Sequence, residues 1–487
     1  MIGGGSSDTR DVLKLFTQRA SQSQPNQYVG YGYWQHDTLT AQIQNASFNV
    51  FTYGFPTPTA NVPRTGTAGW DIDLFGIALI SGYAPYGLEG TGDFNVDFMT
   101  GEFAALADTK MLNLTTYEYQ PTVYPFTAVG RLGSGNAFSG TALVIGPAGG
   151  MSGTIDGRFF GPNAEEIGAT IVAYPQHMNP GPNESNGFVG AITGTRDPSV
   201  APVNLNLTKL QQDLTSTGKT VHFAAGKSPG TFFSLGANAI FEGFDQTVTI
   251  AKNGQISFSA SGRPGLNSTF TDLERVEQTS RFTTYRKTID NLPTTLAMYR
   301  PGSGNTEIAL SYASFGHWTT SVSEPGGEER FDRQYFLYGL PTPVNMLATR
   351  TGSARYEGIV VGAGALSDAN PFEVGGKSMF NFDFTMLKYT GALDLDRLNP
   401  DGSVASSLGR WVIDGIMPGG IPYGGSLTGP TSFISGGGIQ PVFFGPKSEE
   451  LAAQFIIAPI GGIGTDGKPL PGTLWVAGVA LAKQITP

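Results

Sequence analysis

The stretch GRFFGPNAEEIGA, residues 157–169, carries most of what the sequence says about the fold. Two aromatic residues end a strand-like run, a glycine–proline pair interrupts it, and a second strand-like run follows the acidic residues. Asn163 can cap a helical turn, and the two acidic side chains suit the positive end of such a turn. We therefore expect a strand, one helical turn and a second strand, with Glu165 and Glu166 in a structural rather than a catalytic role.

The same phrase recurs 284 residues later as FFGPKSEE, residues 443–450. Four further phrases recur in the same order at offsets of 284 to 286 residues: YGYW (31–34) as FGHW (315–318), YGFPTP (53–58) as YGLPTP (338–343), TGTA (65–68) as TGSA (351–354), and FNVDF (94–98) as FNFDF (380–384). Ordered matches at an almost constant spacing are typical of a duplicated unit. The sequence therefore predicts two homologous lobes.

Each lobe divides into two parts with different strand patterns. In the first part, Pro-Thr-Pro and glycine-rich turns bound strands such as 94–98 and 380–384, which alternate apolar and polar residues. In the second part, short strand-like runs follow one another at even spacing over 137–145, 150–160, 168–173 and 187–194. Even spacing with glycine at the corners predicts a closed barrel or a tight sandwich.

Lobe two carries additional sequence before its first matched phrase, beyond a proline-containing linker near residues 197–202. Two alternating runs, 246–250 and 255–259, flank an Asn-Gly pair, which is a strong hairpin signal. We therefore expect extra β structure in lobe two. Helices are expected only at 9–20, 205–214 and 271–279.

Composition narrows the class of protein. The 487 residues include 68 glycines, 32 prolines and no cysteine, and 39% are hydrophobic and 14% charged. The absence of cysteine excludes disulfides, cysteine-ligated metals and thiol nucleophiles. A net charge of −10 argues against nucleic-acid binding, which needs a basic surface. No apolar run approaches the roughly 18 residues that a membrane-spanning helix requires, and the balance favours an all-β extracytoplasmic protein.

The repeated phrase resembles the signature of the β-barrel domain of the transferrin-binding protein B family, which are bilobed surface lipoproteins of Gram-negative bacteria. The second copy departs from the first at Lys447-Ser448 and has Ala452-Ala453 in place of Gly168-Ala169. The resemblance implies that each lobe is a handle of antiparallel strands followed by an eight-stranded barrel. The glycine- and serine-rich start, residues 3–7, is similar to the anchor peptide of such lipoproteins. It implies an N-terminal lipid anchor on a cysteine that is absent from this chain.

On this interpretation the fold class is all-β, with two homologous lobes. Six segments follow from it: an N-terminal tether with a short helix (1–27), the first handle (28–120), the first barrel (121–198), a linker (199–230), the second handle (231–402) and the second barrel (403–487).

The resemblance implies a non-enzymatic role with no cofactor. Such a protein binds a scarce nutrient or its carrier (an iron carrier, haem, cobalamin or similar) on the outer membrane and passes it to a TonB-dependent transporter. It implies no nucleic-acid partner, and contact with the membrane only through the anchor. Two alternatives stay open: an adhesin or host-evasion surface protein, and a secreted polysaccharide-acting enzyme, since paired carboxylates meet only in the fold.

Recognition would rest on exposed aromatic and loop residues. Tyr83 and Tyr86 lie in a glycine-bracketed loop, and Asn370 and Phe372 lie in the loop at the matching place of lobe two. His177, which has a methionine beside it, is the best haem-ligand candidate, with an ordinary exposed loop histidine as the alternative.

Three further features have structural interpretations. Trp34 and Trp318 recur in both lobes, so we expect both in cores. The acidic run 394–402 has oxygen ligands suited to calcium, but its Asn-Pro-Asp-Gly end is also a good turn, and we predict no metal site. The phrase GIGTDG, residues 462–467, fits a dinucleotide-binding pattern, but prolines follow it where a helix should start, so we expect a loop.

Overall fold

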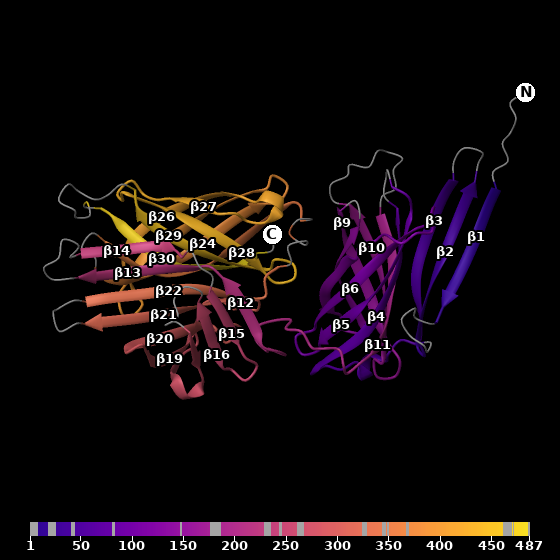
Figure 1. Cartoon of the computed structure of the whole chain (residues 1–487), viewed down its shortest axis with the longest axis horizontal. Helices are drawn as coiled ribbons and strands as arrows, with labels where there is room; N and C mark the ends of the chain where they lie inside the picture. The colour runs from indigo at the N-terminus through magenta and orange to yellow at the C-terminus, as the bar shows by residue number, and fades with distance from the viewer. Residues whose placement is uncertain are drawn as a thin grey trace, which may run out of the picture. The chain divides into compact units, whose positions relative to one another are not determined.

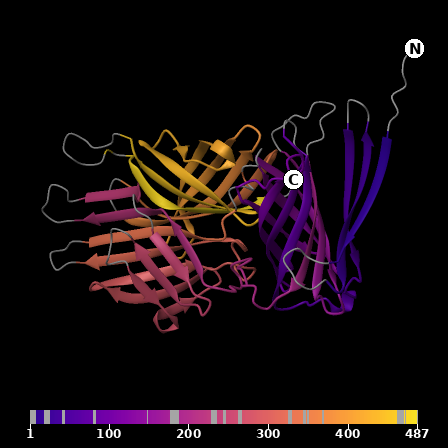
Figure 2. The same ribbon diagram turned by 45° about the vertical axis from the view of Figure 1, so that its right-hand side comes forward.

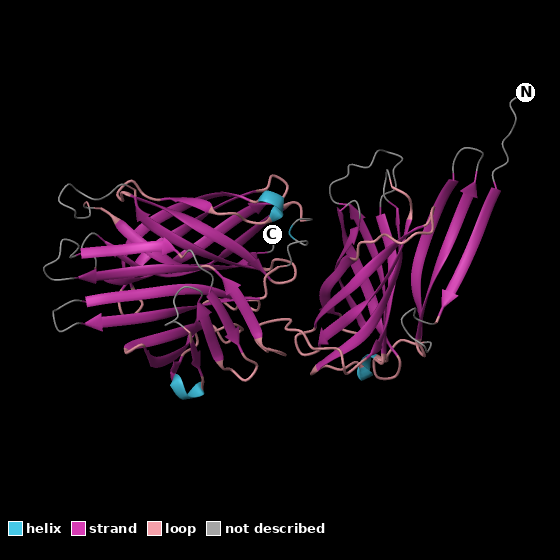
Figure 3. Ribbon diagram, viewed as in Figure 1, coloured by secondary structure: helices cyan, strands magenta, loops and turns pink. Residues whose placement is uncertain are grey.

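The computed structural model describes residues 8–17, 26–39, 44–79, 83–146, 149–175, 187–227, 235–242, 246–260, 267–323, 329–342, 347, 350–366, 370–460, 470 and 472–485. The chain forms two compact units, Met1–Leu205 and Asn206–Pro487. These units correspond to the two predicted lobes. Almost every described element is a strand (Figure 3).

The first unit contains a three-stranded antiparallel sheet and a closed barrel (Figure 1). The sheet, which we call the first handle, has the order β1 (Asp8–Phe16), β2 (Val29–Leu39), β3 (Gln44–Gly54). The barrel closes through β11 and β4, and its eight strands are β4 (Thr67–Leu79), β5 (Tyr86–Asp97), β6 (Glu102–Asn113), β7 (Tyr124–Leu132), β8 (Ala137–Gly146), β9 (Gly149–Phe160), β10 (Glu166–Pro175) and β11 (Gly187–Arg196).

The second unit contains two sheets and a second closed barrel. The larger sheet, the second handle, has the order β14 (Leu235–Phe241), β13 (Thr220–Lys227), β22 (Glu329–Gly339), β21 (Ala313–Ser323), β20 (Leu292–Tyr299), β19 (Phe282–Ile289), β18 (Arg275–Gln278). The smaller sheet, the cover sheet, has the order β12 (Leu214–Gly218), β15 (Gln246–Ile250), β16 (Ile256–Ala260), β17 (Ser268–Phe270). The eight barrel strands are β23 (Ser353–Leu366), β24 (Pro371–Asp383), β25 (Lys388–Leu398), β26 (Val404–Ile416), β27 (Gly425–Thr428), β28 (Ser435–Phe444), β29 (Glu450–Pro459) and β30 (Leu474–Ile485).

Both barrels are filled by side chains. Alternate residues of each strand point inward, and eight strands enclose an interior just wide enough for side chains to pack. The strands of each barrel run obliquely to one another, as the turned view shows (Figure 2). The aromatic residues of the first barrel core are Trp70, Tyr86, Phe94, Phe98, Phe103, Phe126, Phe138, Phe159 and Phe188. The predicted all-β fold with two eight-stranded barrels is confirmed by these strand pairings.

The repeated FNVDF and FNFDF phrases lie in the barrels, at the ends of β5 and β24, and not in the handles. Their aspartates have matching roles in turns. The Asp97 carboxylate accepts the Met99 N–H at 2.9 Å, and the Asp383 carboxylate accepts the Met386 N–H at 2.8 Å. This side-chain capping of the turn explains why the aspartate recurs.

The boundaries between handle and barrel differ from those predicted. The first barrel begins at Thr67 and the second at Ser353, so residues 67–120 and 353–402, assigned to handles, supply barrel strands. The segment 199–230, assigned to a linker, holds β12 and β13. The sequence prediction assigned strands to handle or barrel by their spacing along the chain. In the structure, a strand belongs to the barrel if its hydrogen bonds help to close it.

The predicted helices are wrong within the described residues. Strand β1 occupies Asp8–Phe16, because Leu13 and Leu15 alternate with residues of the opposite face. Residues 205–213 form turns and bends, and the 271–279 region has only the 3-10 turn Asp272–Glu274 before β18. The Asn253-Gly254 hairpin is confirmed, joining β15 and β16. No helix among the described residues is long and apolar enough to cross a membrane.

Candidate functional site

The signature stretch holds the handle and the barrel of each lobe together. Glu166, the first residue of β10, is only 3% exposed. Its carboxylate accepts the backbone N–H groups of Gln27, Tyr28 and Val29 at 2.7, 2.9 and 2.8 Å. Hydrogen bonds to a carboxylate are stronger than neutral ones. The second glutamate of the signature therefore fixes the start of β2 against the barrel.

Lobe two repeats this clamp with its own residues. Glu450, at the start of β29, accepts the N–H groups of Ser311, Tyr312 and Ala313 at 2.7, 2.8 and 2.9 Å. Burial raises the pKa of the Glu450 carboxyl, and the three N–H groups act in the opposite direction. We call these two arrangements the glutamate clamps; they confirm that the signature's second glutamate is structural.

The turn before each clamp is not the expected helical turn. Residues 161–164 form a turn in which Gly161 has φ of 85° and Ala164 φ of 62°. A Cβ atom on Gly161 would lie 2.5 Å from a Glu165 carboxylate oxygen, so the position favours glycine. Glu165 accepts the Asn163 N–H at 2.7 Å and its side-chain amide at 3.0 Å. Asn163 thus donates to the acidic residue instead of capping a helix.

The described residues hold no cluster of three or more histidine, aspartate or glutamate side chains suited to a metal ion. The acidic run 394–402 is used otherwise: Asp394 pairs with Arg410 at 3.1 Å, and Asp401 accepts the Ser403 N–H at 2.9 Å. The glycine-rich stretch 462–467 lies outside the described residues. The carboxylates of Asp394 and Asp401 are thus engaged by groups of the protein itself.

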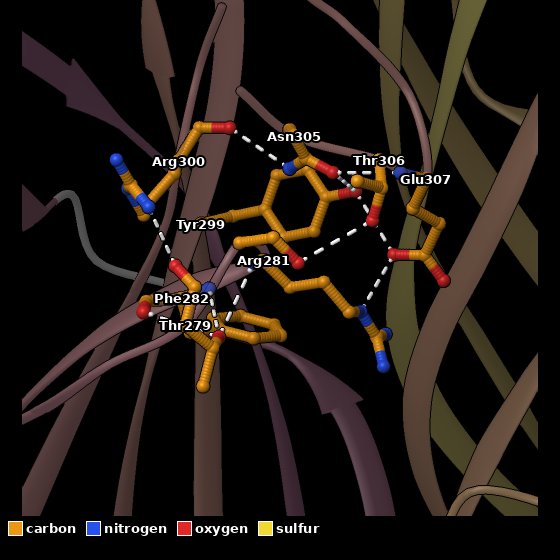
Figure 4. A network of polar contacts seen from close by, with 9 residues as sticks. Thr279, Arg281, Phe282, Tyr299, Arg300, Asn305, Thr306 and Glu307 are labelled. Atoms are coloured by element: carbon orange, nitrogen blue, oxygen red, sulfur yellow. Dashed lines mark hydrogen bonds and ion pairs between the residues drawn. The ribbon is translucent and has the colours of Figure 1, made fainter. Parts of the chain in front are cut away.

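A network of polar contacts lies at one end of β19 and β20 in the second handle (Figure 4). The Tyr299 hydroxyl donates to Glu307 at 2.9 Å, and Arg281 donates to the same carboxylate oxygen at 2.8 Å. The Asn305 amide donates to the Arg300 carbonyl at 2.9 Å. Burial and the Glu307 charge raise the pKa of Tyr299, so its hydroxyl stays a donor. Because these groups bond to one another, the network fastens the segment after β20 to the sheet.

The predicted binding residues have different environments. Tyr83 is 47% exposed and Asn370 is exposed, in the loops that join the first two strands of each barrel, as the repeat predicted. Tyr86 and Phe372 are only 6% and 9% exposed and pack in the barrel cores. The prediction that these two residues form surface contacts is wrong. Tyr86 lies in β5 and Phe372 in β24, and both side chains point into a barrel. His177 lies outside the described residues, so its role stays a prediction.

Sequence reasoning missed a surface on the first handle. The side chains that face away from the barrel include Leu13, Leu15 and Trp34, which are 58%, 56% and 51% exposed. The rings of Phe51 and Tyr53 lie beside Gly32 and Gly30 on the same side of the sheet. We call this apolar surface, made of Leu13, Leu15, Trp34, Phe51 and Tyr53, the open handle face.

The second handle has the same residues in the same register, except that Met298 stands in place of Leu15, but there they are buried. Leu13 pairs with Trp34 in β1 and β2, and Leu296 pairs with Trp318 in β20 and β21. Trp318 is 3% exposed, and the Phe258 ring of the cover sheet lies 4.3 Å from it. The core formed there comprises Leu207, Leu214, Val248, Ile256, Phe258, Phe270, Tyr285, Leu296, Met298, Trp318, Phe336 and Tyr338.

The prediction that both tryptophans are buried is therefore right for Trp318 and wrong for Trp34. No described strand covers the open handle face, whereas lobe two supplies the cover sheet from its additional sequence. The sequence did contain a sign of this difference, because the strand-like runs 246–250 and 255–259 of lobe two have no counterpart in lobe one. Exposed apolar patches on a folded protein mark interaction surfaces.

No family model and no curated protein sequence matches the chain. Among solved structures, the chain is similar to a transferrin-binding protein B double mutant from Haemophilus parasuis Hp5, at 14% identity and a TM-score of 0.31, over 98% of this chain and 86% of that one. It is also similar to isotype 1 transferrin-binding protein B from serogroup B Neisseria meningitidis, at 15% identity and a TM-score of 0.29, over 97% and 89%. The N-lobe domain of lactoferrin-binding protein B of Moraxella bovis is similar over 55% of this chain and 99% of that chain, at 14% identity and a TM-score of 0.25. At these scores the likeness remains a resemblance, and the architecture rests on the strand pairings.

Proposed function

We propose that the protein is a non-enzymatic, surface-exposed binding protein of a Gram-negative outer membrane. It captures a scarce nutrient, by itself or on a carrier protein, and passes it to a TonB-dependent transporter. The resemblance of the duplicated signature supports the class of protein. We infer that a lipid anchor, on an N-terminal cysteine absent from this chain, holds the protein at the membrane.

One observation carries the binding role: the open handle face exposes an aliphatic and aromatic surface that its duplicate buries. Tryptophan, tyrosine and other large apolar side chains supply most binding energy at protein interfaces. The face is a flat sheet surface and not an enclosed pocket, so it suits a protein better than a small molecule. We assign it to the carrier protein or the transporter. Tyr83 and Asn370, at the loops of the two barrels, are further proposed contacts.

The test is a pull-down with the immobilised full chain and a detergent extract of the bacterium's outer membranes. The wild type is expected to retain a transporter or a carrier protein, and the double variant Leu13→Thr, Trp34→Thr is expected to lose it. The matched control is Leu106→Thr, which removes an apolar side chain, 54% exposed, from the outer wall of the first barrel. Equal retention by the double variant, or no retained protein, would contradict the proposal.

Analysis of the bound material identifies the nutrient. Elemental analysis and the absorption spectrum of the chain purified from its source distinguish an iron carrier, haem and cobalamin. Turnover of a glycan that a single aspartate or glutamate substitution abolishes would instead establish the polysaccharide-acting enzyme. Retention of a host surface protein with no transporter would favour the adhesin.

A further inference from the structure

A groove of about 730 Å³ runs along β3 in the first unit. One side is formed by residues of β3 from Val50 to Gly54, and the other by residues of the barrel strands β8, β9 and β10. Among the described residues, β3 is an edge strand that pairs only with β2. The groove therefore borders a row of backbone groups without a neighbouring strand.

The register shows which of these groups face the groove. The Phe55 N–H donates to the Tyr28 carbonyl at 2.9 Å, continuing the register that pairs Gly54 with Val29. In an antiparallel pair, residues alternate between exchanging hydrogen bonds with the partner strand and directing both groups away from it. Val50 and Thr52 are the residues that direct their N–H and C=O groups into the groove.

In lobe two a strand covers part of the matching edge: β13 pairs with Glu329 to Phe336 of β22, which correspond to Gln44 to Phe51 of β3. β22, the counterpart of β3, pairs along its free side with β13, where Val221 lies opposite Tyr335 and Phe223 opposite Arg333. The side chains of Val221 and Phe223 point to the barrel and are fully buried there. The barrel also binds the strand directly, because the Gln454 side chain donates to the Lys219 carbonyl at 2.9 Å.

The barrel surface is covered beside the edge of β22 and exposed beside the edge of β3. On β29, the outward-facing Ile456 and Ala458 pack against the core that contains β13 and β14. On β10, the signature alignment places Val172 and Tyr174 at the same positions, and these are 37% and 58% exposed. Among the described residues, lobe one thus keeps the strand edge from Gln44 to Phe51 and the barrel wall at Val172 and Tyr174 without the strand that covers them in lobe two. The groove adjoins this edge at Val50.

We propose that the free edge of β3 from Gln44 to Thr52, which enters the groove at Val50, is a strand-addition site for an extended segment of a partner protein. The segment runs antiparallel to β3, bonds to the backbone of Phe48, Val50 and Thr52, and places small, β-branched or aromatic side chains against the barrel at alternate positions. Recognition of this kind takes affinity from main-chain hydrogen bonds and specificity from alternate side chains. The inference goes beyond the proposed function because it requires no nutrient.

A short segment fits the groove better than a second copy of the chain. A second copy would bring its own barrel along with its β3 edge, because the two lie side by side at the groove. One strand edge also offers far less than the roughly 1,600 Å² of total buried surface of a stable protein–protein interface. The occupant in lobe two is likewise only a two-stranded segment.

The test uses a fluorescent peptide with the sequence of residues 219–227, KTVHFAAGK, added to the full chain. We expect saturable binding by fluorescence anisotropy. N-methylation at Val221 and Phe223 blocks the N–H groups that would face β3, and weakens binding by at least about tenfold, since each lost hydrogen bond costs about 1 kcal/mol. N-methylation at His222 and Ala224, whose N–H groups face the other side, leaves binding within about threefold.

The protein side of the contact is tested at one position. Thr52→Pro removes an N–H that faces the groove and leaves the β2–β3 hydrogen bonds in place, as proline is tolerated on edge strands. It is expected to abolish peptide binding, and Thr52→Val, which keeps the N–H and the shape, is expected to retain it. If Thr52→Pro does not fold, the two N-methylated peptides still decide the question.

Three results would overturn the proposal. They are absence of saturable binding, equal binding of the two N-methylated peptides, and undiminished binding by a folded Thr52→Pro variant. A dimer in sedimentation that Thr52→Pro dissociates would make a second copy the occupant and the assignment to a partner wrong. These assays contain no nutrient, so their failure is separate from a failed membrane pull-down.

Discussion

The two handles of this protein have the same central residues and opposite surroundings. Trp318, in the second handle, packs against Phe258 of the cover sheet, whereas Trp34, in the first, is half exposed. The strand partners of the two tryptophans are leucines in both lobes. The difference shows that burial here is decided by strands elsewhere in the chain, and not by the local pattern. In the described part of lobe one no such strands lie over the handle, and the equivalent surface is exposed.

The largest expected effect separates the two tryptophans. Trp318→Ala removes a buried ring and is expected to destabilise the second lobe by about 3–5 kcal/mol. Trp34→Ala removes an exposed ring and is expected to change stability by less than about 1 kcal/mol. Urea unfolding of the full chain, followed by circular dichroism, measures both. Equal losses would mean that the open handle face is covered in solution.

The glutamate clamps are expected to behave alike in the two lobes. Glu166→Ala and Glu450→Ala each leave three backbone N–H groups, some of them buried, without their acceptor, which costs about 2–3 kcal/mol. Thermal unfolding is expected to show one destabilised transition for each variant. Glu89→Ala, on the outer wall of the first barrel, is the control. A clamp variant as stable as this control would show that the signature glutamate does not hold handle to barrel.

A smaller effect distinguishes the handles by pH. Burial, with a contribution from the Arg333 charge, lowers the pKa of His317 well below its usual value of 6.5, whereas lobe one has Tyr33 at this position. The unfolded chain takes up a proton as the pH falls through about 6.5 and the folded chain does not. The neutral His317 therefore stabilises the folded lobe at pH values above about 6.5, and this contribution is lost as the pH falls below that value.

The measurement is the unfolding midpoint of the second lobe between pH 7.5 and about 5.5, in the wild type and in His317→Gln. The wild type is expected to lose up to about 1.4 kcal/mol per pH unit more than the variant. Parallel pH profiles would contradict a neutral, buried His317.

Some of this architecture follows from the sequence and some does not. Strands β8 to β11 were predicted within a few residues, because glycine and alternation mark their ends locally. The clamp was invisible, since Glu166 bonds to residues 137 to 139 positions earlier in the chain. The predicted helix at 9–20 was wrong because its apolar residues also fit a strand. In the structure, Leu13 and Leu15 lie on one face of β1, which pairs with β2. The exposure of Trp34 depends on a missing cover sheet, which only a comparison of whole lobes shows.

Within the described residues, no strand covers the first handle as the cover sheet and β13 cover the second. Amide hydrogen exchange in the free full chain tests this difference at positions that match between the lobes. We expect the amides of Phe48 and Val50 on β3 to exchange far faster than those of Arg333 and Tyr335, which pair with β13. Equal protection at both pairs would contradict it, because a strand would then cover β3 as well.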